Sequence, residues 1–211
     1  YKVLKETIIA SQNIRFEGDG YSDEWKDEAA RRGLTNICHV PEAIMKFNDP
    51  QSRSVLIGEK IFNENELNCR IEVELEKFTK KVQIESRVLG DLAINHIVPT
   101  AVIYQNRLLE NLRGLKEIFS TEEYEEMTAD RKDLVREIQR RILSIKKAVH
   151  DMTEARKVAN HLGSQVEKAF SYEEKVRPYL EEIREHIDSL ELEIDDEIWP
   201  LPKYRELLFT K

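Results

Sequence analysis

Cysteine, proline and glycine are scarce in this 211-residue chain, which has 2, 6 and 7 of them. Cys38 and Cys69 form no C-x-x-C pair, so a disulfide scaffold and a cysteine zinc motif are excluded, and a reducing compartment is indicated. Because proline and glycine, which interrupt helices, are few, long helices are possible. Neither a long apolar run nor a signal peptide is found. We therefore expect a cytoplasmic protein without a membrane partner.

Charge, in contrast, is abundant: 35% of the residues are charged, and 41 acidic residues outnumber 33 basic ones, for a net charge of −8. An acidic surface repels phosphate backbones and anionic lipid, so we expect no nucleic-acid partner. The large charged fraction together with 40% hydrophobic residues is typical of amphipathic helices with wide polar faces.

Residues 1–62 show short, well-punctuated segments. A helix is predicted over residues 1–12, where Val3, Leu4, Ile8 and Ile9 can form one apolar stripe. Ser22 is a candidate N-cap, and Gly33 is a candidate end of the same helix. Pro41 can open a further helix over residues 42–47, before the Asn-Asp-Pro break at 48–50.

Residues 63–194 change to long apolar stripes in steps of three and four. Asn63 with Glu66 resembles a capping box and begins a helix over about 63–112, which Pro99 should kink near Ile97. Its seam includes Ile71, Leu75, Phe78, Val82, Leu89 and Leu92, with Glu85 at one position where an apolar residue is expected.

Two more long helices are predicted. After a turn over residues 114–120, Ser120 and Glu123 suggest a second capping box for a helix to about residue 162. Ser171 and Glu174 suggest a third, with Pro178 close to its start. The two seams are Leu134, Ile138, Ile142, Ile145, Val149 and Met152, then Val176, Leu180, Ile183, Ile187, Leu190 and Ile194.

These patterns predict an all-α fold of long antiparallel helices, as a bundle or coiled coil, plus a cluster of short helices. We divide it into short helices over 1–62, a long-helix bundle over 63–194, and a tail with a short helix over 195–211, packed as one unit with the bundle. Because the first residue is Tyr1, already inside an expected helix, we expect the chain to be part of a longer protein.

A catalytic constellation is not apparent. A dimetal bundle needs Glu-x-x-His, and no histidine here has a glutamate three residues before it. His39 and Glu42 have the reverse order across Pro41 and are interpreted as a loop pair. His96 falls on the apolar seam and is interpreted as a structural histidine, while the adjacent His150 and Asp151 point to different helix faces.

Other candidate sites are also weak. The Gly-Asp-Gly at 18–20 lacks the rest of a nucleotide-binding loop and is interpreted as a turn. The basic residues Arg140, Arg141, Lys146 and Lys147 have acidic neighbours, which indicates a salt-bridged surface. The acidic residues 195–197 lack calcium-loop spacing. We therefore assign no catalytic, cofactor-binding or metal-binding residue, although a stand-alone metalloenzyme remains an alternative for metal analysis to test.

Several stretches together resemble the carboxy-terminal region of the type III glutamine synthetases. They are GDGYSDEW at 18–25, EAARRGL at 28–34, PEA at 41–43, RVLGDLAINHIVPTA at 87–101, YQN at 104–106, DDEIWPL at 195–201 and KYRELLF at 203–209. The similarity keeps its order along nearly the whole chain. Glu17 and residues 48–54 depart from the pattern and leave local loop structure open.

The resemblance implies a parent enzyme that joins ammonia to glutamate with ATP and magnesium or manganese, in stacked rings of subunits. The parent's catalytic barrel precedes the matched region, so the resemblance assigns no site residue, cofactor or activity to this chain. It implies a helical domain that supports assembly or stability, with the rest of the parent chain and other subunits as partners. The alternative is an independent coiled-coil interaction module that recruits a regulator through an exposed seam including Ile71, Leu75 and Phe78.

Overall fold

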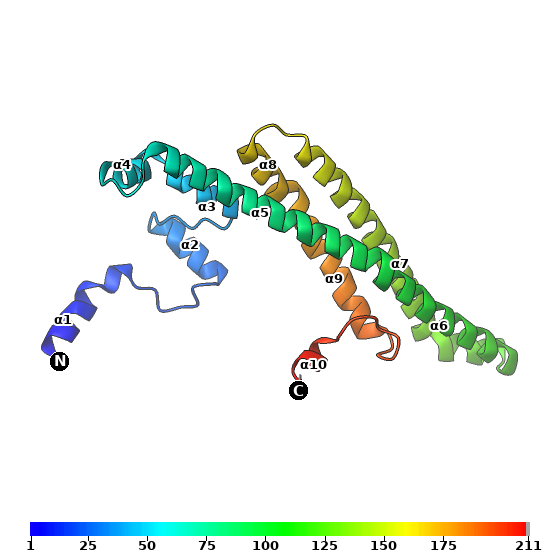
Figure 1. Cartoon of the computed structure of the whole chain (residues 1–211). Helices are drawn as coiled ribbons and strands as arrows, with labels where there is room; N and C mark the ends of the chain where they lie inside the picture. The colour runs from blue at the N-terminus through cyan, green and yellow to red at the C-terminus, as the bar shows by residue number, and fades with distance from the viewer. Residues whose placement is uncertain (210–211) are drawn as a thin grey trace.

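The computed structural model describes residues 1–209, without the side chains of residues 13, 204 and 205. All regular secondary structure in that part of the chain is helical (Figure 1). The two longest elements are a rod made of α5 (Glu64–Leu92), η3 (Ala93–Ile97) and α6 (Val98–Ile118), and the helix α7 (Thr121–Asn160), which returns beside it. The predicted all-α fold is confirmed.

The first 60 residues contain short helices. They are α1 (Lys2–Ala10), η1 (Gln12–Ile14), α2 (Asp23–Arg31), α3 (Val40–Met45), η2 (Lys46–Asn48) and α4 (Pro50–Gly58). The hydroxyl of Ser22 caps α2 by accepting the Trp25 N–H at 3.3 Å. Gly33 follows α2 with a φ of +70°, a conformation that glycine adopts without a Cβ clash. The helix α4 was not predicted: the proline at the expected break instead occupies its first position.

Two capping boxes begin the two long elements. The Asn63 side chain accepts the Glu66 N–H at 2.9 Å and the Glu66 carboxylate accepts the Asn63 N–H at 2.8 Å. Ser120 and Glu123 make the same reciprocal pair. The predicted turn over 114–120 is wrong in extent, because α6 continues through Gly114 to Ile118 and the chain reverses only at Phe119 and Ser120. A helical glycine costs only about 1 kcal/mol, so a single glycine need not end a helix.

Both internal prolines are accommodated by π-helical turns. Val98, just before Pro99, donates its N–H to the Ala93 carbonyl five residues back. Arg177, just before Pro178, does the same to Tyr172 at the end of η4 (Tyr172–Val176). A wider turn relieves the clash between a proline ring and the preceding turn. The rod therefore runs through Pro99 as one helical unit of 55 residues, roughly 80 Å at 1.5 Å per residue.

The third predicted capping box is wrong. Ser171 lies inside a helix that begins earlier, at α8 (Gln165–Ser171), where Ser164 accepts the Glu167 N–H at 3.5 Å. From there the helix passes through η4 into α9 (Arg177–Glu193) without a break. The proline at 178 had suggested a helix start, but η4 places it in mid-helix.

The main core lies where the rod, α7 and α9 meet. Its fully buried members include Ile97, Ile138, Ile145, Met152, Tyr172, Val176, Ile183 and Leu190. On the rod, the buried line continues from Val82 through Ser86 and Gly90 to Ala93, while Glu85 is exposed. Small residues thus occupy the centre of the rod, where the sequence predicted Leu89 and Leu92. Those two leucines are only partly buried.

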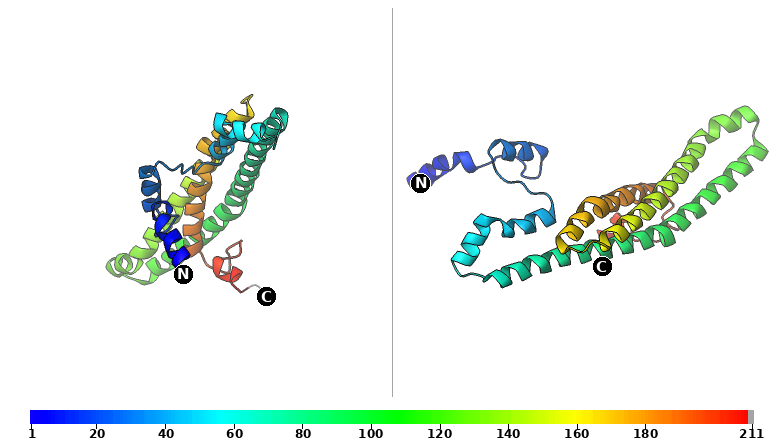
Figure 2. Two further views of the ribbon diagram at one scale, coloured as in Figure 1. Left: turned by 90° about the vertical axis from the view of Figure 1, so that its left-hand side faces the viewer. Right: turned by 90° about the horizontal axis from the view of Figure 1, so that it is seen from above.

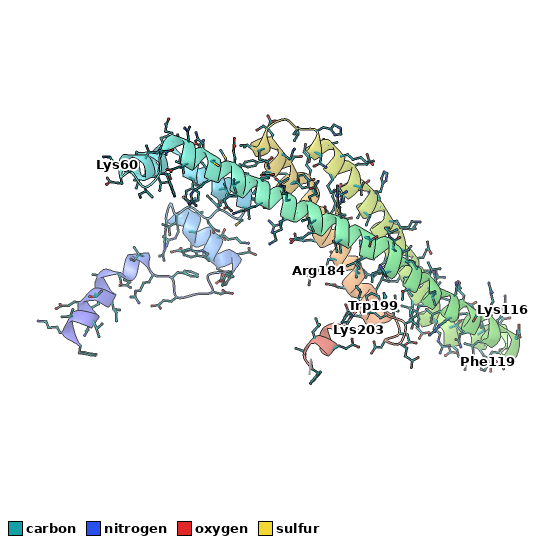
Figure 3. The ribbon with its side chains drawn as sticks, viewed as in Figure 1. Lys60, Lys116, Phe119, Arg184, Trp199 and Lys203 are labelled. Atoms are coloured by element: carbon teal, nitrogen blue, oxygen red, sulfur yellow. The ribbon has the colours of Figure 1, made fainter. Side chains whose placement is uncertain are left out.

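The residues after α9 fold back against its end, as the labelled Trp199 and Lys203 show in Figure 3. The Lys203 ammonium donates to the carbonyls of Glu191 at 2.6 Å and Ile194 at 3.1 Å, and it pairs with Asp196. A cation there complements the negative end of the helix dipole. Trp199 is 8% exposed and belongs to the main core. The last element is α10 (Tyr204–Leu207).

A second, smaller core joins α3, α4 and α8 to the beginning of α5. Its buried members are Leu67, Ile71, Leu75 and Ala169. Farther toward the N-terminus, α1, η1 and α2 extend away from the rod, as Figure 1 and the right-hand view of Figure 2 show. We call residues 1–34 the arm. Within it, the rings of Phe16 and Trp25 lie 4.9 Å apart, and Arg32 donates to the Arg15 carbonyl at 3.0 Å.

Gly90 tests the close approach of the rod and α7. A Cβ on Gly90 would lie 3.5 Å from both Met152 Cε and Val149 Cγ1, an ordinary contact. Gly90→Ala should therefore raise the free energy of unfolding by about 1 kcal/mol through helix propensity. Gly90→Leu should be less stable than Gly90→Ala by about 1–3 kcal/mol, because the larger side chain overpacks the contact. Urea denaturation of the chain measures both.

Gly114 provides the matched control, because a Cβ there meets no atom within 4 Å. Gly114→Ala and Gly114→Leu should be equally tolerated. Equal stability of the alanine and leucine variants at position 90 would contradict the packing described.

Candidate functional site

A buried carboxylate connects the short N-terminal helices to the bundle. Glu173, in η4, has a side chain that is 5% exposed. Its Oε1 lies 2.9 Å from His39 Nδ1, and Arg177 Nη1 donates to Oε1 at 2.9 Å and to Oε2 at 3.1 Å. His39 immediately precedes α3, at the root of the segment that leads to the arm. We call His39, Glu173 and Arg177 the Glu173 cluster.

The Glu173 cluster lies in a hollow of about 260 Å³, lined by Cys38, His39, Glu173, Arg177, Pro178 and Glu181. Burial of a carboxylate requires hydrogen bonds or an opposite charge. Arg177 supplies the charge, and His39 supplies a second partner from a segment that is 134 residues distant in sequence. This arrangement fixes the start of α3 on the bundle.

Sequence reasoning missed Glu173, although it considered His39. The structure pairs His39 with Glu173 and not with Glu42. The available signal was the spacing of Glu173 and Arg177, which lie four residues apart and before Pro178. The erroneous capping box placed Glu173 at a helix start, where it is expected to be solvated.

The other histidines are dispersed. His96 is exposed, so its predicted place on the apolar seam is wrong: the π turn of η3 turns Ile97 toward the core instead. His150 is exposed, and His161 Nδ1 lies 2.6 Å from the Lys157 carbonyl near the end of α7. His186 Nδ1 lies 3.4 Å from Arg141 Nη1.

The charged stretches form ion pairs within the chain. Arg140 and Arg141 each lie 2.9 Å from the Glu137 carboxylate, and Lys147 lies 3.4 Å from Asp151. The acidic residues after α9 also have cationic partners. Asp195 lies 3.2 Å from Arg107, and Asp196 pairs with Lys203.

Two further properties concern the part of the chain that the structure describes. Its His, Cys, Asp and Glu side chains form no group of three or more that could hold a metal ion. Its helices include none with both the length and the hydrophobicity needed to cross a membrane. Cys38 and Cys69 are exposed free thiols.

The arm exposes several large apolar side chains on α1. No residue of α1 is buried. Its large apolar side chains are 74% exposed at Val3, 67% at Leu4, 52% at Ile8 and 59% at Ile9. The sequence correctly placed a helix here, but nothing in the described chain covers its apolar residues. By contrast, Ile71 and Leu75, which the interaction-module alternative requires to be free, are buried in the second core.

These features define a class: an extended α-helical domain with a long antiparallel hairpin and an apolar N-terminal arm. Comparison with known proteins agrees with the resemblance. A family model described as "Glutamine synthetase C-terminal domain" matches residues 1–116. The chain therefore belongs to the family of glutamine synthetase C-terminal domains.

The relatives match the chain along its length. It is 76% identical over 211 residues to a glutamine synthetase of Bacteroides fragilis (strain YCH46), which covers all of this chain and 29% of that protein. It is 27% identical over 220 residues to a type-3 glutamine synthetase of Dictyostelium discoideum, and 28% identical over 209 residues to a glutamine synthetase of Butyrivibrio fibrisolvens. Those matches cover 100% and 99% of this chain, and again 29% of each relative.

Removing the Glu173 charge should loosen α3 from the bundle. Glu173→Gln leaves the Arg177 guanidinium without its counter-ion and weakens the bond to His39. Because both partners are partly exposed, we expect a loss of about 1–2 kcal/mol. Amide hydrogen exchange in residues 40–45 should accelerate about tenfold, since 1.4 kcal/mol corresponds to a factor of ten. Glu174→Gln, at an exposed neighbour, is the control, and the same acceleration in both variants would contradict the role of the cluster.

Proposed function

We propose that the chain works as the helical C-terminal domain of a type III glutamine synthetase, an enzyme that joins ammonia to glutamate at the expense of ATP. The observation that carries the proposal is the 76% identity over the whole chain to a much longer glutamine synthetase. The catalytic residues, the nucleotide site and the magnesium or manganese ions belong, in this proposal, to the part of the parent outside the present chain. The parent acts in the cytoplasm, without nucleic acid or membrane as a partner.

Activity measurements test this division of labour. The full-length parent should form glutamine from glutamate, ammonia and ATP, whereas the 211-residue chain should show no turnover above a buffer control. Appreciable glutamine formation by the chain alone would refute the proposal.

Within the parent, we assign the domain an assembly or stabilising role, with the rest of the parent chain and other subunits as partners. The arm supports this assignment, because contiguous exposed apolar residues on a soluble protein mark contact surfaces. The occupant that we assign to α1 is the remainder of the same parent chain, since the relatives are more than three times as long as the matched region. Residues 195–209 act as one unit with the bundle in this scheme, because Trp199 lies in its core. Residues 210–211 of the predicted tail lie outside the described residues.

Polar substitutions on α1 test the docking of the arm. Leu4→Glu with Ile8→Glu should leave the stability of the 211-residue chain unchanged, since both side chains are already exposed there. In the full-length synthetase the same pair should lower the melting temperature or the particle mass, because each buried aliphatic side chain contributes about 1.5–3 kcal/mol. Differential scanning fluorimetry and mass photometry measure these effects.

The control changes two exposed lysines of the same helix, Lys2→Gln with Lys5→Gln, which removes charge but little apolar area. An unaltered full-length particle after the Leu4 and Ile8 substitutions would show that α1 does not contact the rest of the parent.

A further inference from the structure

Two arginines face each other across the antiparallel pair of α5 and α7. Two contacts define the register of α5 against α7. The Gln83 amide donates to Asn160 Oδ1 at 3.4 Å, and two turns further along α5, Gly90 approaches Met152. Arg87 lies one turn after Gln83, and Arg156 lies one turn before Asn160. The register therefore brings Arg87 and Arg156 together.

Neither guanidinium has a counter-ion. Within residues 1–209, no carboxylate forms an ion pair with Arg87 or Arg156. Arg156 Nε is buried and has no hydrogen-bond acceptor. Burial and the charge of Arg87 lower the pKa of Arg156. Other partly buried arginines near this core do have carboxylate partners: Arg177 is paired with Glu173, and Arg141 with Glu137.

The surroundings are polar and ordered. The Tyr172 hydroxyl, whose residue is fully buried, donates to Asn160 Oδ1 at 2.8 Å, and the charges of Arg156 and Arg87 act on it. Asn160 Oδ1 thus accepts from both Tyr172 and Gln83. Arg87 is exposed, so its guanidinium can be reached by an anion from solvent, whereas Arg156 is half-buried.

We propose that Arg87 and Arg156 form an oxyanion-binding site at the crossing of α5, α7 and η4, which takes a carboxylate or phosphate group. An anion between them converts a like-charge contact into two charge-assisted interactions and supplies the acceptor that Arg156 Nε lacks. Planar guanidinium groups match the geometry of both ligand types. The site is independent of the proposed enzymatic role, since it rests only on residues of this chain.

Urea denaturation of the 211-residue chain at pH 7 and constant ionic strength, with chloride replaced stepwise by inorganic phosphate, tests the site. The wild type should be stabilised saturably at millimolar phosphate. At twenty times the dissociation constant its folding equilibrium constant should rise about 20-fold. Arg87→Gln and Arg156→Gln should abolish the saturable rise. In chloride alone Arg87→Gln should be at least as stable as the wild type, because the repulsion is removed.

Arg113→Gln is the matched control: Arg113 is exposed on α6 and lies outside this crossing. It should keep the phosphate response of the wild type. An equal, unsaturable rise in all variants would be a general effect of a kosmotropic ion and would overturn the proposal. A parallel titration with acetate distinguishes the sources. Saturation by phosphate alone identifies a phosphate ligand, saturation by acetate identifies a carboxylate, and saturation by neither overturns the site.

Discussion

The antiparallel pairing of the rod with α7 is the contact on which the other elements depend. The rod has the small residues Ser86, Gly90 and Ala93 in its buried line, and Gly90 lies against Val149 and Met152 of α7. Small side chains allow neighbouring helices to approach, and Met152 of α7 then fills the space beside Gly90. The α8–η4–α9 segment packs against both helices and completes the core. Without this close approach, Tyr172, Ile183 and Leu190 would lack a common interior.

Pro99 and Pro178 shape this core in the same way, because each follows a π-helical turn. Each π turn widens one helical turn and shifts the face on which the following residues lie. Ile97, at the end of η3, and Ala101, one turn later, are buried in the core. The turn of η4 likewise leaves Tyr172, Glu173 and Val176 buried. Glu173 is buried by this local geometry, which also sets Arg177 within hydrogen-bond distance of it. The proline therefore helps to position the only buried carboxylate among the described residues.

Local patterns predicted the parts of the fold that local chemistry decides. The capping boxes at Asn63 and Ser120 were correct because each pairs residues three apart. The stripe from Ile138 to Met152 was correct because all of its members face one core. The capping box predicted at Ser171 failed because a serine with a glutamate three residues later gives the same pattern whether the serine caps a helix or lies inside one. The turn predicted from Gly114 failed because one glycine costs a helix only about 1 kcal/mol, and α6 continues through it to Ile118.

The candidate sites combine residues that are far apart in the sequence, and local sequence patterns therefore could not predict them. His39 and Glu173 meet only because α3 returns to the bundle, and Arg87 meets Arg156 only in this register of the hairpin. Hydrophobicity could not place the centre of the rod either, since Ser86 and Gly90 are buried there while Ile84 and Val88 are exposed. A prediction of the buried helix face from apolar residues alone misses positions where a small side chain is needed so that two helices can approach each other.

The position of the Glu173 cluster bears on how the arm meets its partner. The arm exposes its apolar residues, whereas the segment that follows it is bound to the bundle by a buried carboxylate and by the second core. Binding is stronger when the binding segment is restrained beforehand, because less conformational freedom is lost on association. A fixed root limits the directions in which α1 can extend. The Glu173 cluster and the apolar residues of α1 therefore have complementary roles. The cluster limits the orientation of the arm, and the apolar residues supply the area for contact.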